Sequence, residues 1–395
     1  MNYPTPHQKT AMPSFSFQTV PHLVMERGVS ARLGALLAQR FRPGRACVIT
    51  DAFLLRSGLL TPSLQSLRSA GFEVQVIDDV QADPPDHVVE AVTARAREFG
   101  AELVIGLGGG SSMDVAKLVA VLLAGRQPLA EMYGLDKVQG ERLPLVQVPT
   151  TAGTGSEVTA VAIVTTGATT KSGIVARQLY ADMAVLDATL TVGLPAAITA
   201  ATGIDAMVHA IEAYTSLHLK NPVSDQLAIS ALRLLSGHLL RVCADGQDVD
   251  AREAMLLGAM QAGQAFANAP VAAVHALAYP LGGRFHLPHG LSNALVLAPV
   301  LRFNVEAAAP LYAQLAQVLL PHAVGSESDK ATAFIAHLES LLAATHLPLR
   351  LRDHGIGSND LPMLAADAML QTRLLNNNPR ELGLADALAI YQSAL

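Results

Sequence analysis

The segment ELVIGLGGGSSMDVAKLVAVLLA, residues 102–124, decides the fold of the first half of the chain. It starts as an apolar run of strand length, passes through a run of glycines and continues from about Met113 as a helix-forming stretch. Glycines let backbone N–H groups approach an anion closely, and a helix N-terminus adds partial positive charge at the same place. The segment predicts a strand, a phosphate-binding turn and a helix. Because it follows neither the Walker pattern nor G-x-G-x-x-G, a plain strand-to-helix turn is the alternative.

On both sides of this segment, apolar runs of strand length alternate with helical stretches. The predicted strands are residues 45–51, 73–78, 102–108 and 143–150, and the predicted helices are 62–70, 86–99 and 113–124. Strands joined by helices of this length form right-handed crossovers, hence a parallel sheet with both faces covered. We also expect an edge strand or hairpin at 15–25, and short strands at 162–166 and 183–189 that complete the sheet.

A second loop that suits anions, PTTAGTGSEVT at residues 149–159, directly follows a predicted strand. Its hydroxyl groups can hydrogen-bond phosphate or ribose, or they can cap a helix. They belong to Thr150, Thr151, Thr154 and Ser156. Because ligands bind at the carboxyl ends of the strands in open α/β sheets, we expect a dinucleotide to contact both loops.

Two charged residues also suit a dinucleotide. Asp51 ends the first predicted strand, where its carboxylate can hydrogen-bond ribose hydroxyls and repel a 2′-phosphate, which favours NAD over NADP. Capping of the following helix is an equally good interpretation. Lys171 is the only Lys or Arg between Arg142 and Arg177 and can balance phosphate charge, although a solvated lysine is the ordinary case.

From about residue 194 the pattern changes to helical periodicity alone. Helices are predicted at residues 196–214, 223–242, 249–267, 306–320, 330–345 and 361–374. The sequence beyond this point has no alternating apolar run, which predicts an all-helical second domain. The predicted organisation is a loose N-terminus at 1–12, an α/β dinucleotide-binding domain at 13–193 and a helical metal-binding domain at 194–395.

The first predicted helix of the second domain carries the pattern of a metal site, TGIDAMVHAIEAY. Asp205 and His209 are four residues apart, so on a helix they lie on the same face, one turn apart. A carboxylate oxygen and an imidazole nitrogen suit a divalent cation such as Fe, Zn, Mn or Ni. Further ligands are expected from two of the three histidines in a cluster downstream, His275, His286 and His289.

Composition excludes several classes of protein. The chain has 395 residues and a net charge of -6 without a basic stripe, so nucleic acid and acidic membrane surfaces are poor partners. We find no uninterrupted apolar stretch of the ~20 residues that a membrane span needs. The charged fraction, 15%, is low and indicates that surface is hidden in an oligomer. Isolated cysteines and a polar, proline-containing N-terminus indicate a cytoplasmic protein.

Taken together, the motifs resemble those of a known family. GGGSSMDVAK, PTTAGTGSEVT, ADMAVLD, GIDAMVHAIEAY, an H-x13-H spacing that ends in LPHG, and NPREL occur in this order. In these motifs the chain is similar to the iron-containing alcohol dehydrogenases of group III, over nearly its whole length from about Phe15. The resemblance implies a dehydroquinate synthase-like architecture: an N-terminal α/β nucleotide domain, a C-terminal helical domain, NAD(P) in the cleft between them, and a homodimer.

The resemblance also assigns roles to individual residues. The implied ligands of Fe2+, or of Zn2+ or Ni2+ in its place, are Asp205, His209, His275 and His289, while His286 falls in the cleft wall or behind a ligand. The implied pyrophosphate site is Gly109, Gly110, Ser111 and Asp114, and the second cofactor loop contributes Thr150, Thr151 and Thr154. Asp51 matches the position that binds the adenosine ribose, and Lys171 matches a cofactor-facing lysine.

One position departs from the common pattern of the family. Many members have a second histidine four residues after the third ligand, whereas this chain has Tyr279. A histidine there is commonly given a role in proton relay or substrate contact, and tyrosine, with a pKa of about 10, is a poorer base. We take Tyr279 and His289 as the catalytic candidates. Arg284 is either a carboxylate partner for a substrate or part of a surface ion pair.

The implied reaction is reversible hydride transfer between a small primary alcohol and NAD, with the cation acting as a Lewis acid. In having tyrosine at this position the chain resembles hydroxyacid-oxoacid transhydrogenase. The alternative activities are therefore that of this transhydrogenase or one like that of 4-hydroxybutyrate dehydrogenase. The related architectures also include a lyase like dehydroquinate synthase and a metal-free maleylacetate reductase, and a catalytically quiet NAD-binding regulatory protein is a rival of another class. The intact set of metal ligands argues against the metal-free reductase and against the quiet regulatory protein. We expect substrate preference to depend on residues near Val161, Phe266 and Leu374.

Overall fold

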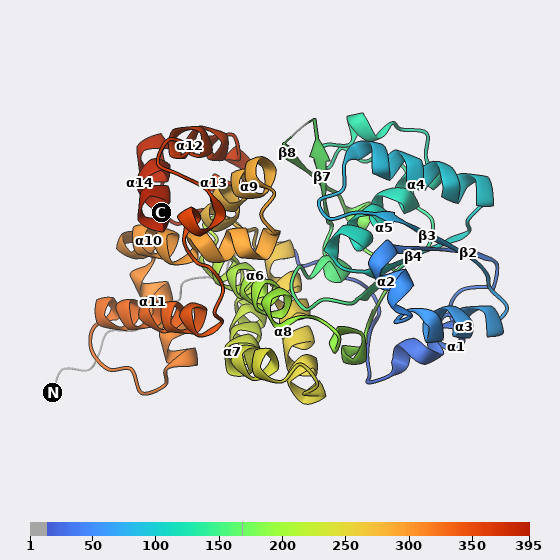
Figure 1. The fold of residues 1–395 in the computed structure, drawn as a ribbon, viewed down its shortest axis with the longest axis horizontal. Helices are drawn as coiled ribbons and strands as arrows, with labels where there is room; N and C mark the ends of the chain where they lie inside the picture. Colours follow the sequence, from blue (N-terminus) through green and yellow to red (C-terminus); the bar gives the residue numbers. More distant parts are fainter. Residues whose placement is uncertain (1–13, 168) are drawn as a thin grey trace.

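The protein consists of a strand-containing region and a helical region that lie side by side (Figure 1). The structure is a computed structural model that describes residues 14–167 and 169–395. The loose N-terminus predicted at 1–12 lies outside the described residues. The last strand ends at Leu186 and the first long helix of the second region begins at Ala196. The domain boundary predicted between residues 193 and 194 falls between these elements and stays a prediction.

A six-stranded sheet forms the centre of the first region. Its strands follow the order β1-β9-β6-β4-β2-β3, and every neighbouring pair is parallel. They are β1 (Leu23–Met25), β2 (Arg45–Asp51), β3 (Glu73–Val80), β4 (Leu103–Gly108), β6 (Leu145–Pro149) and β9 (Met183–Leu186). The predicted parallel α/β fold is confirmed, and of the segment 15–25 only its end, β1, forms an edge strand.

Helices cover both faces of this sheet because successive side chains of each strand point to opposite sides. In β2, Cys47 and Ile49 lie in one apolar cluster, whereas Ala46 and Val48 lie in the other, and all are fully buried. A parallel sheet with two covered faces requires apolar side chains on both sides of each strand. The helices of this region are α1 (Leu33–Leu37), α2 (Ala52–Ser57), α3 (Thr61–Ser69), α4 (Asp86–Phe99) and α5 (Gly110–Ala124).

The sheet has a topological switch point between β2 and β4. From β2 the chain moves outward to β3 and then returns to the other side of β2 to form β4. In open α/β sheets the crevice outside the carboxyl ends of the strands at such a point binds ligands. Asp51 at the end of β2 and the glycine turn after β4 both lie at this edge of the sheet.

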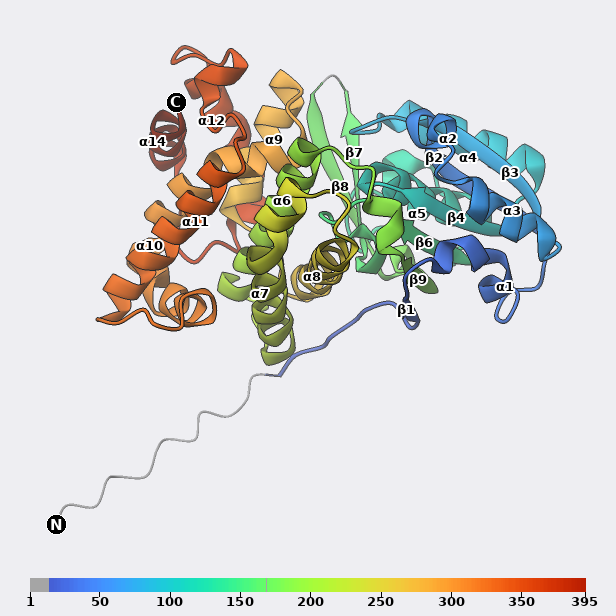
Figure 2. The same ribbon diagram turned by 60° about the horizontal axis from the view of Figure 1, so that its bottom comes forward.

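The segment 162–166 does not complete the main sheet, contrary to our expectation. It belongs to β7 (Val161–Thr166), which pairs antiparallel with β8 (Thr170–Val175), and β5 (Gly134–Leu135) joins β8 to make a separate three-stranded sheet. β7 contacts α5 and β8 contacts the helix Ala273–Phe285, so this hairpin stands between the two regions (Figure 2). The sequence could not reveal this, because the same alternation suits either sheet.

The predicted all-helical second region is confirmed for the described residues. Its helices are α6 (Ala196–Thr215), α7 (Pro222–Ala244), α8 (Val249–Asn268), α9 (Ala273–Phe285), α10 (His289–Leu319), α11 (Glu327–Ala344), α12 (Leu361–Met369), α13 (Thr372–Leu375) and α14 (Leu384–Ala394). The sequence did not predict α9, α14 or the first half of α10. Pro280 and Pro299 lie inside the segments that were missed, where a proline normally breaks the hydrogen-bond pattern, so packing overrides the local signal.

The loop 149–159 packs the sheet region directly against the helical region. At Gly153 an added Cβ would lie 2.7 Å from the Cβ of Thr202 in α6. Gly155 has a φ of +60°, and an added Cβ there would lie 2.5 Å from the Cα of Gly263 in α8. These contacts leave no room for side chains. The second predicted anion loop is therefore held against α8 and against α6, the helix that carries Asp205 and His209.

Two helices, α7 and α10, are long and apolar enough to cross a membrane by length and composition, with a mean hydropathy of 1.4 each. Both pack within the helical region, α7 on α6 and α8, and α10 on α6, α9 and α11. Buried core helices of large domains have the same composition. We therefore assign both to the core of the helical region.

Candidate metal centre and cofactor cleft

Side chains from three helices converge at one point of the helical region. They are Asp205, His209, His275 and His289, and their ligand atoms all lie within 4.8 Å of one another. Asp205 Oδ1 lies 3.9 Å from His209 Nε2, 3.7 Å from His275 Nε2 and 3.5 Å from His289 Nε2. Atoms that each lie about 2.0–2.2 Å from one tetrahedrally coordinated cation have similar separations from one another.

Local sequence places each of these side chains. Asp205 and His209 lie one turn apart on α6, His275 lies in the first turn of α9, and His289 begins α10 directly after Pro288. The start of α10 can approach α6 because the next residue is Gly290, where an added Cβ would lie 2.3 Å from a backbone oxygen of α6. His275 and His289 lie at the starts of α9 and α10 and reach the cluster, whereas His286 follows the end of α9 and is not part of it.

Burial shapes the chemistry of this cluster. Asp205, His209 and His275 are 2%, 4% and 2% exposed, whereas the His289 side chain is 36% exposed. Burial lowers the pKa of His209 to about 3, so its imidazole is neutral and has a free lone pair. A carboxylate with neutral imidazoles is a donor set for Fe2+, Zn2+ or Ni2+. The residues present fit a divalent cation, and the cluster opens to its surroundings on the His289 side.

Sequence analysis did not single out Glu212, the residue that orients His275. Its carboxylate accepts hydrogen bonds from His275 Nδ1 and from the backbone N–H of Val274, both at 2.6 Å. Because Glu212 accepts the proton of Nδ1, the lone pair of His275 lies on Nε2, which faces Asp205 and is free to bind a cation. A signal was present, because Glu212 follows His209 by three residues and so lies on the same face of α6.

We expect Glu212→Gln to weaken metal binding by about 10- to 100-fold, the usual cost of losing a carboxylate behind a ligating histidine. An amide carries no charge to support the Nδ1–H of His275. The dissociation constant for Zn2+, measured by competition with a chromophoric chelator, checks this. Glu253→Gln is the matched control, because Glu253 pairs with exposed Arg27 outside the cluster. Equal Zn2+ affinities for the two variants would contradict the orienting role.

Asn293 is a further residue that the sequence reasoning missed. Its Nδ2 donates to Asp205 Oδ1 at 2.6 Å and lies 3.2 Å from His275 Nε2 and 3.4 Å from His289 Nε2. Asn293 follows His289 by four residues, so the helical spacing that paired Asp205 with His209 applies here as well. The amide positions the carboxylate within the cluster.

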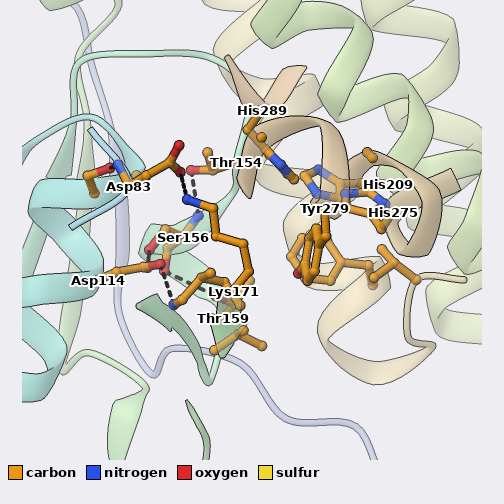
Figure 3. A pocket seen from close by; sticks show the side chains of 18 of the residues that line it. Asp83, Asp114, Thr154, Ser156, Thr159, Lys171, His209, His275, Tyr279 and His289 are labelled. Carbon is orange, nitrogen blue, oxygen red and sulfur yellow. Dashed lines mark hydrogen bonds and ion pairs between the residues drawn. The ribbon is translucent and has the colours of Figure 1, made fainter. Parts of the chain in front are cut away.

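The candidate metal centre opens into a cleft between the two regions, with an empty volume of about 1180 Å³ that includes open solvent (Figure 3). The sheet region contributes the glycine turn, the second loop and the β7–β8 hairpin, and the helical region contributes α8, α9 and α10. The predicted cofactor and catalytic residues that line the cleft are Gly110, Ser111, Asp114, Thr154, Lys171, Tyr279 and His289. Asp51, Gly109, Thr150 and Thr151 are not part of its lining.

The glycine turn has the form of an anion site. Gly109 caps α5 in an extended conformation, and Gly110 is the first residue of the helix. At Gly110 an added Cβ would lie 2.7 Å from Thr154 Cγ2, so a side chain has no room there. The first N–H groups of a helix lack intrahelical partners, and the first turn of α5 contains no acidic residue. This turn suits a pyrophosphate.

Asp114 connects the two predicted cofactor loops. Its carboxylate accepts hydrogen bonds from Ser156 Oγ at 2.6 Å and from the backbone N–H of Ile163 at 2.9 Å. The fully buried ammonium of Lys117 lies 3.4 Å away and also donates to the Val161 carbonyl at 2.6 Å. A free carboxylate would repel a pyrophosphate, and Lys117 offsets this negative charge. Asp114 therefore positions the turn, the second loop and β7 relative to one another.

Lys171 is not a solvated surface lysine. Its side chain is 7% exposed, and Nζ pairs with Asp83 Oδ1 at 2.8 Å and donates to Thr165 Oγ1 at 3.1 Å. Figure 3 shows Lys171 on the sheet side of the cleft, across from the histidines. The predicted cofactor-facing position is consistent with this placement.

Comparison with known proteins agrees with this geometry. Residues 21–188 match the family described as iron-containing alcohol dehydrogenase, and residues 199–395 match the C-terminal part of the Fe-containing alcohol dehydrogenase family. The chain belongs to the iron-containing alcohol dehydrogenase family.

Relatives of known structure and activity cover most of the chain. It is 42% identical over 351 residues to long-chain-alcohol dehydrogenase 1 of Geobacillus thermodenitrificans, with 88% of each chain covered. The crystal structure of a 1,3-propanediol oxidoreductase matches with a TM-score of 0.93 and 33% identity, covering 97% of this chain and 100% of that one. A sulfoacetaldehyde reductase from Bifidobacterium kashiwanohense in complex with NAD+ matches with a TM-score of 0.85 and 26% identity, covering 97% and 99%. The chain is an oxidoreductase of the iron-containing alcohol dehydrogenase type.

In this iron-containing alcohol dehydrogenase, Tyr279 lies beside the candidate metal centre, with its ring centroid 6.0 Å from that of His289. Burial raises the pKa of Tyr279 to about 12, while the nearby Arg373 guanidinium opposes the rise. The phenol stays protonated at neutral pH. Tyr279 can therefore donate a hydrogen bond into the cleft but cannot act as a general base there.

The structure decides between the two interpretations of Arg284 and corrects the predicted placement of His286. Arg284 pairs with Asp367 through bonds of 2.7 and 3.2 Å and does not line the cleft, so it is the surface ion pair rather than the substrate contact. His286 is exposed, has a φ of +55° and ends α9 in the left-handed conformation. It lies neither in the cleft lining nor behind a ligand, because the turn between α9 and α10 points it outward.

Asp51 has the capping role that the sequence left open. Its Oδ1 accepts a hydrogen bond from the backbone N–H of Leu54 at 2.9 Å, which makes it the N-cap of α2. Leu54 also lies next to the glycine turn, with its Cδ1 3.5 Å from where a Cβ on Gly108 would stand. The capped helix thus borders the predicted pyrophosphate site, and the ribose contact of Asp51 stays a prediction.

Proposed function

We propose that this family member is an NAD-dependent, Fe2+-dependent dehydrogenase that oxidises small primary alcohols and reduces the corresponding aldehydes. The observation that carries the proposal is one cleft with an acid and three imidazoles on its helical side and an anion-binding turn on its sheet side. Relatives named for long-chain alcohols, 1,3-propanediol and sulfoacetaldehyde support a primary alcohol or aldehyde as substrate.

Asp205, His209, His275 and His289 would hold the cation. A bound divalent ion would supply Lewis-acid stabilisation of the negative charge that develops on the substrate oxygen. Glu212 and Asn293 orient His275 and Asp205, and burial keeps His209 neutral. The partly exposed His289 lies on the side that faces the cleft, where Tyr279 can donate a hydrogen bond to the substrate.

The N-terminus of α5 would bind the pyrophosphate of NAD, with Gly109, Gly110 and Ser111 contributing backbone N–H groups. Lys171, which is paired with Asp83, would face the cofactor from the same side of the cleft. The second loop lies beside this glycine turn and would contribute the hydroxyl groups of Thr150, Thr151 and Thr154 to the cofactor site. Asp51 supports NAD over NADP, because a carboxylate at the end of β2 repels a 2′-phosphate while its free oxygen can accept from a ribose hydroxyl.

The overall reaction balances as alcohol plus NAD+ giving aldehyde, NADH and a proton. The carbinol C–H bond breaks, its hydrogen leaves as a hydride with both electrons, and the hydroxyl proton is released to water. Tyr279 does not take up this proton, because its pKa is raised to about 12. The protein positions the two reactants in one cleft.

Metal removal and reconstitution test the proposal. Treatment with a chelator should abolish NAD reduction with 1-butanol or 1,3-propanediol, and anaerobic Fe2+ should restore it, with Zn2+ and Ni2+ compared in parallel. NADP should give a lower kcat/KM than NAD. Untreated protein with its metal content measured is the control, and full activity after complete metal loss would refute the metal requirement.

We further propose a homodimer in the cytoplasm. The low charged fraction, 15%, supports an oligomer that hides part of the surface. Cys47 and Cys243 are unpaired, which suits a reducing compartment. Light scattering during gel filtration gives the mass in solution, and a mass near 41.4 kDa would exclude the dimer.

A further inference from the structure

Arg373 is a cation in the cleft that neither the sequence motifs nor the resemblance assigns. It lies on the short helix α13, is exposed, and lines the cleft together with Tyr279 and Val175. Its Nη2 lies 3.4 Å from where a Cβ on Gly173 would stand, so the guanidinium lies over β8 at a residue without a side chain. Lys171, Gly173 and Val175 share one face of β8, because side chains alternate along a strand. The guanidinium thus lies on the same face of the hairpin as the cleft.

The charge of Arg373 is not balanced inside the protein. Across residues 14–167 and 169–395, no carboxylate lies within 4.0 Å of its guanidinium, and its side chain makes no hydrogen bond. The other lysine or arginine of the cleft lining, Lys171, is paired with Asp83. Arg284, in the last turn of α9, is paired with Asp367. An arginine that lines a cleft with all five donors free is available for a ligand anion.

Arg373 enters the cleft from the helical region. The short helix α13 packs against α9, which carries His275 and Tyr279, and the Tyr279 ring centroid is 6.0 Å from that of His289. Arg373 and the histidines of the candidate metal centre line the same cleft, so one molecule can place an oxygen at the metal centre and an anion at Arg373. The planar guanidinium fork matches the geometry of a carboxylate or a sulfonate.

We propose that Arg373 binds an anionic group at the far end of the substrate, so that the enzyme prefers ω-hydroxy acids, or the aldehydes derived from them, to neutral alcohols of similar length. This rests on the proposed function and narrows its substrate class. The anion is recognised by chemistry that carboxylates and sulfonates share, and the reacting hydroxyl remains a primary alcohol.

The test compares 4-hydroxybutanoate, 3-hydroxypropane-1-sulfonate and 1-butanol as substrates of the metal-loaded wild type and of Arg373→Met. The ratio of kcat/KM for each anion to kcat/KM for 1-butanol should fall about 10- to 100-fold in the variant, since a hydrogen bond to a charged group contributes about 1.5–3 kcal/mol. The loss should lie mainly in KM. Arg373→Lys should recover only part of the ratio, because an ammonium lacks the fork. The two anions distinguish a carboxylate site from a sulfonate site.

Arg284→Met is the matched control, because it removes an arginine that is paired outside the cleft. An unchanged ratio in Arg373→Met would overturn the proposal. So would an equal loss for all three substrates together with a raised KM for NAD, since that would assign Arg373 to the cofactor. If no alcohol is oxidised at all, the proposed function fails instead. Calorimetric titration of the NAD complex with 4-hydroxybutanoate then decides on Arg373, because wild type should bind and Arg373→Met should not.

Discussion

Asp205→Ala is expected to abolish stable metal binding and to lower kcat/KM for alcohols by about a thousandfold or more. Asp205 supplies the only carboxylate of the cluster, and each of the three histidines has its Nε2 within 3.9 Å of Asp205 Oδ1. Without this charge the cation faces neutral ligands alone, and the loss of several kcal/mol of charge stabilisation corresponds to about three powers of ten in rate. Metal content after gel filtration and steady-state NAD reduction measure the two effects.

The variant should still fold. A buried carboxylate is costly to desolvate, so replacing it with alanine leaves neutral histidines and a small cavity rather than an unpaired charge. Circular dichroism and thermal unfolding check this. Asp250→Ala is the control, because that carboxylate pairs with Arg27 at the surface and is 74% exposed. One bound metal per chain in Asp205→Ala, or activity equal to that of the control, would show that the cluster is not the metal centre.

Gly110→Val is expected to raise the KM for NAD by about 10- to 100-fold while the metal content stays unchanged. A Cβ at this position would lie 2.7 Å from Thr154 Cγ2, so the side chain must displace the second loop or fill the turn. Forcing extra atoms into a close contact costs about 1–3 kcal/mol, which corresponds to this range. Titration of NADH fluorescence gives the affinity directly.

A double variant makes this prediction sharper. Gly110→Val combined with Thr154→Ala removes the atom that the new side chain meets, so part of the lost NADH affinity should return. Gly237→Val is the control, because an added Cβ at that exposed position in α7 meets nothing within 4 Å. If Gly110→Val bound NADH as tightly as the control, the turn after β4 would not be the pyrophosphate site.

The sequence by itself determined the features that depend on local periodicity. Apolar runs separated by amphipathic helices predicted the parallel sheet, and α4 occupies the predicted residues 86–99. The four-residue spacing of Asp205 and His209 predicted that both lie on one face of α6. The change to helical periodicity near residue 194 predicted the second region. These patterns repeat within one element, so they can be read without knowing what the element packs against.

Only the tertiary structure decided which groups meet across elements. Periodicity identified residues 162–166 as a strand but not which sheet the strand joins, and Pro280 and Pro299 lie in helical segments that the sequence analysis missed and that packing retains. The sequence analysis singled out Arg284, which Asp367 neutralises, and not Arg373, which faces the cleft without a partner among the described residues. The physical reason is that charge pairing and burial are set by neighbours far away in the chain, while secondary structure is set largely by residues a turn or a pleat apart.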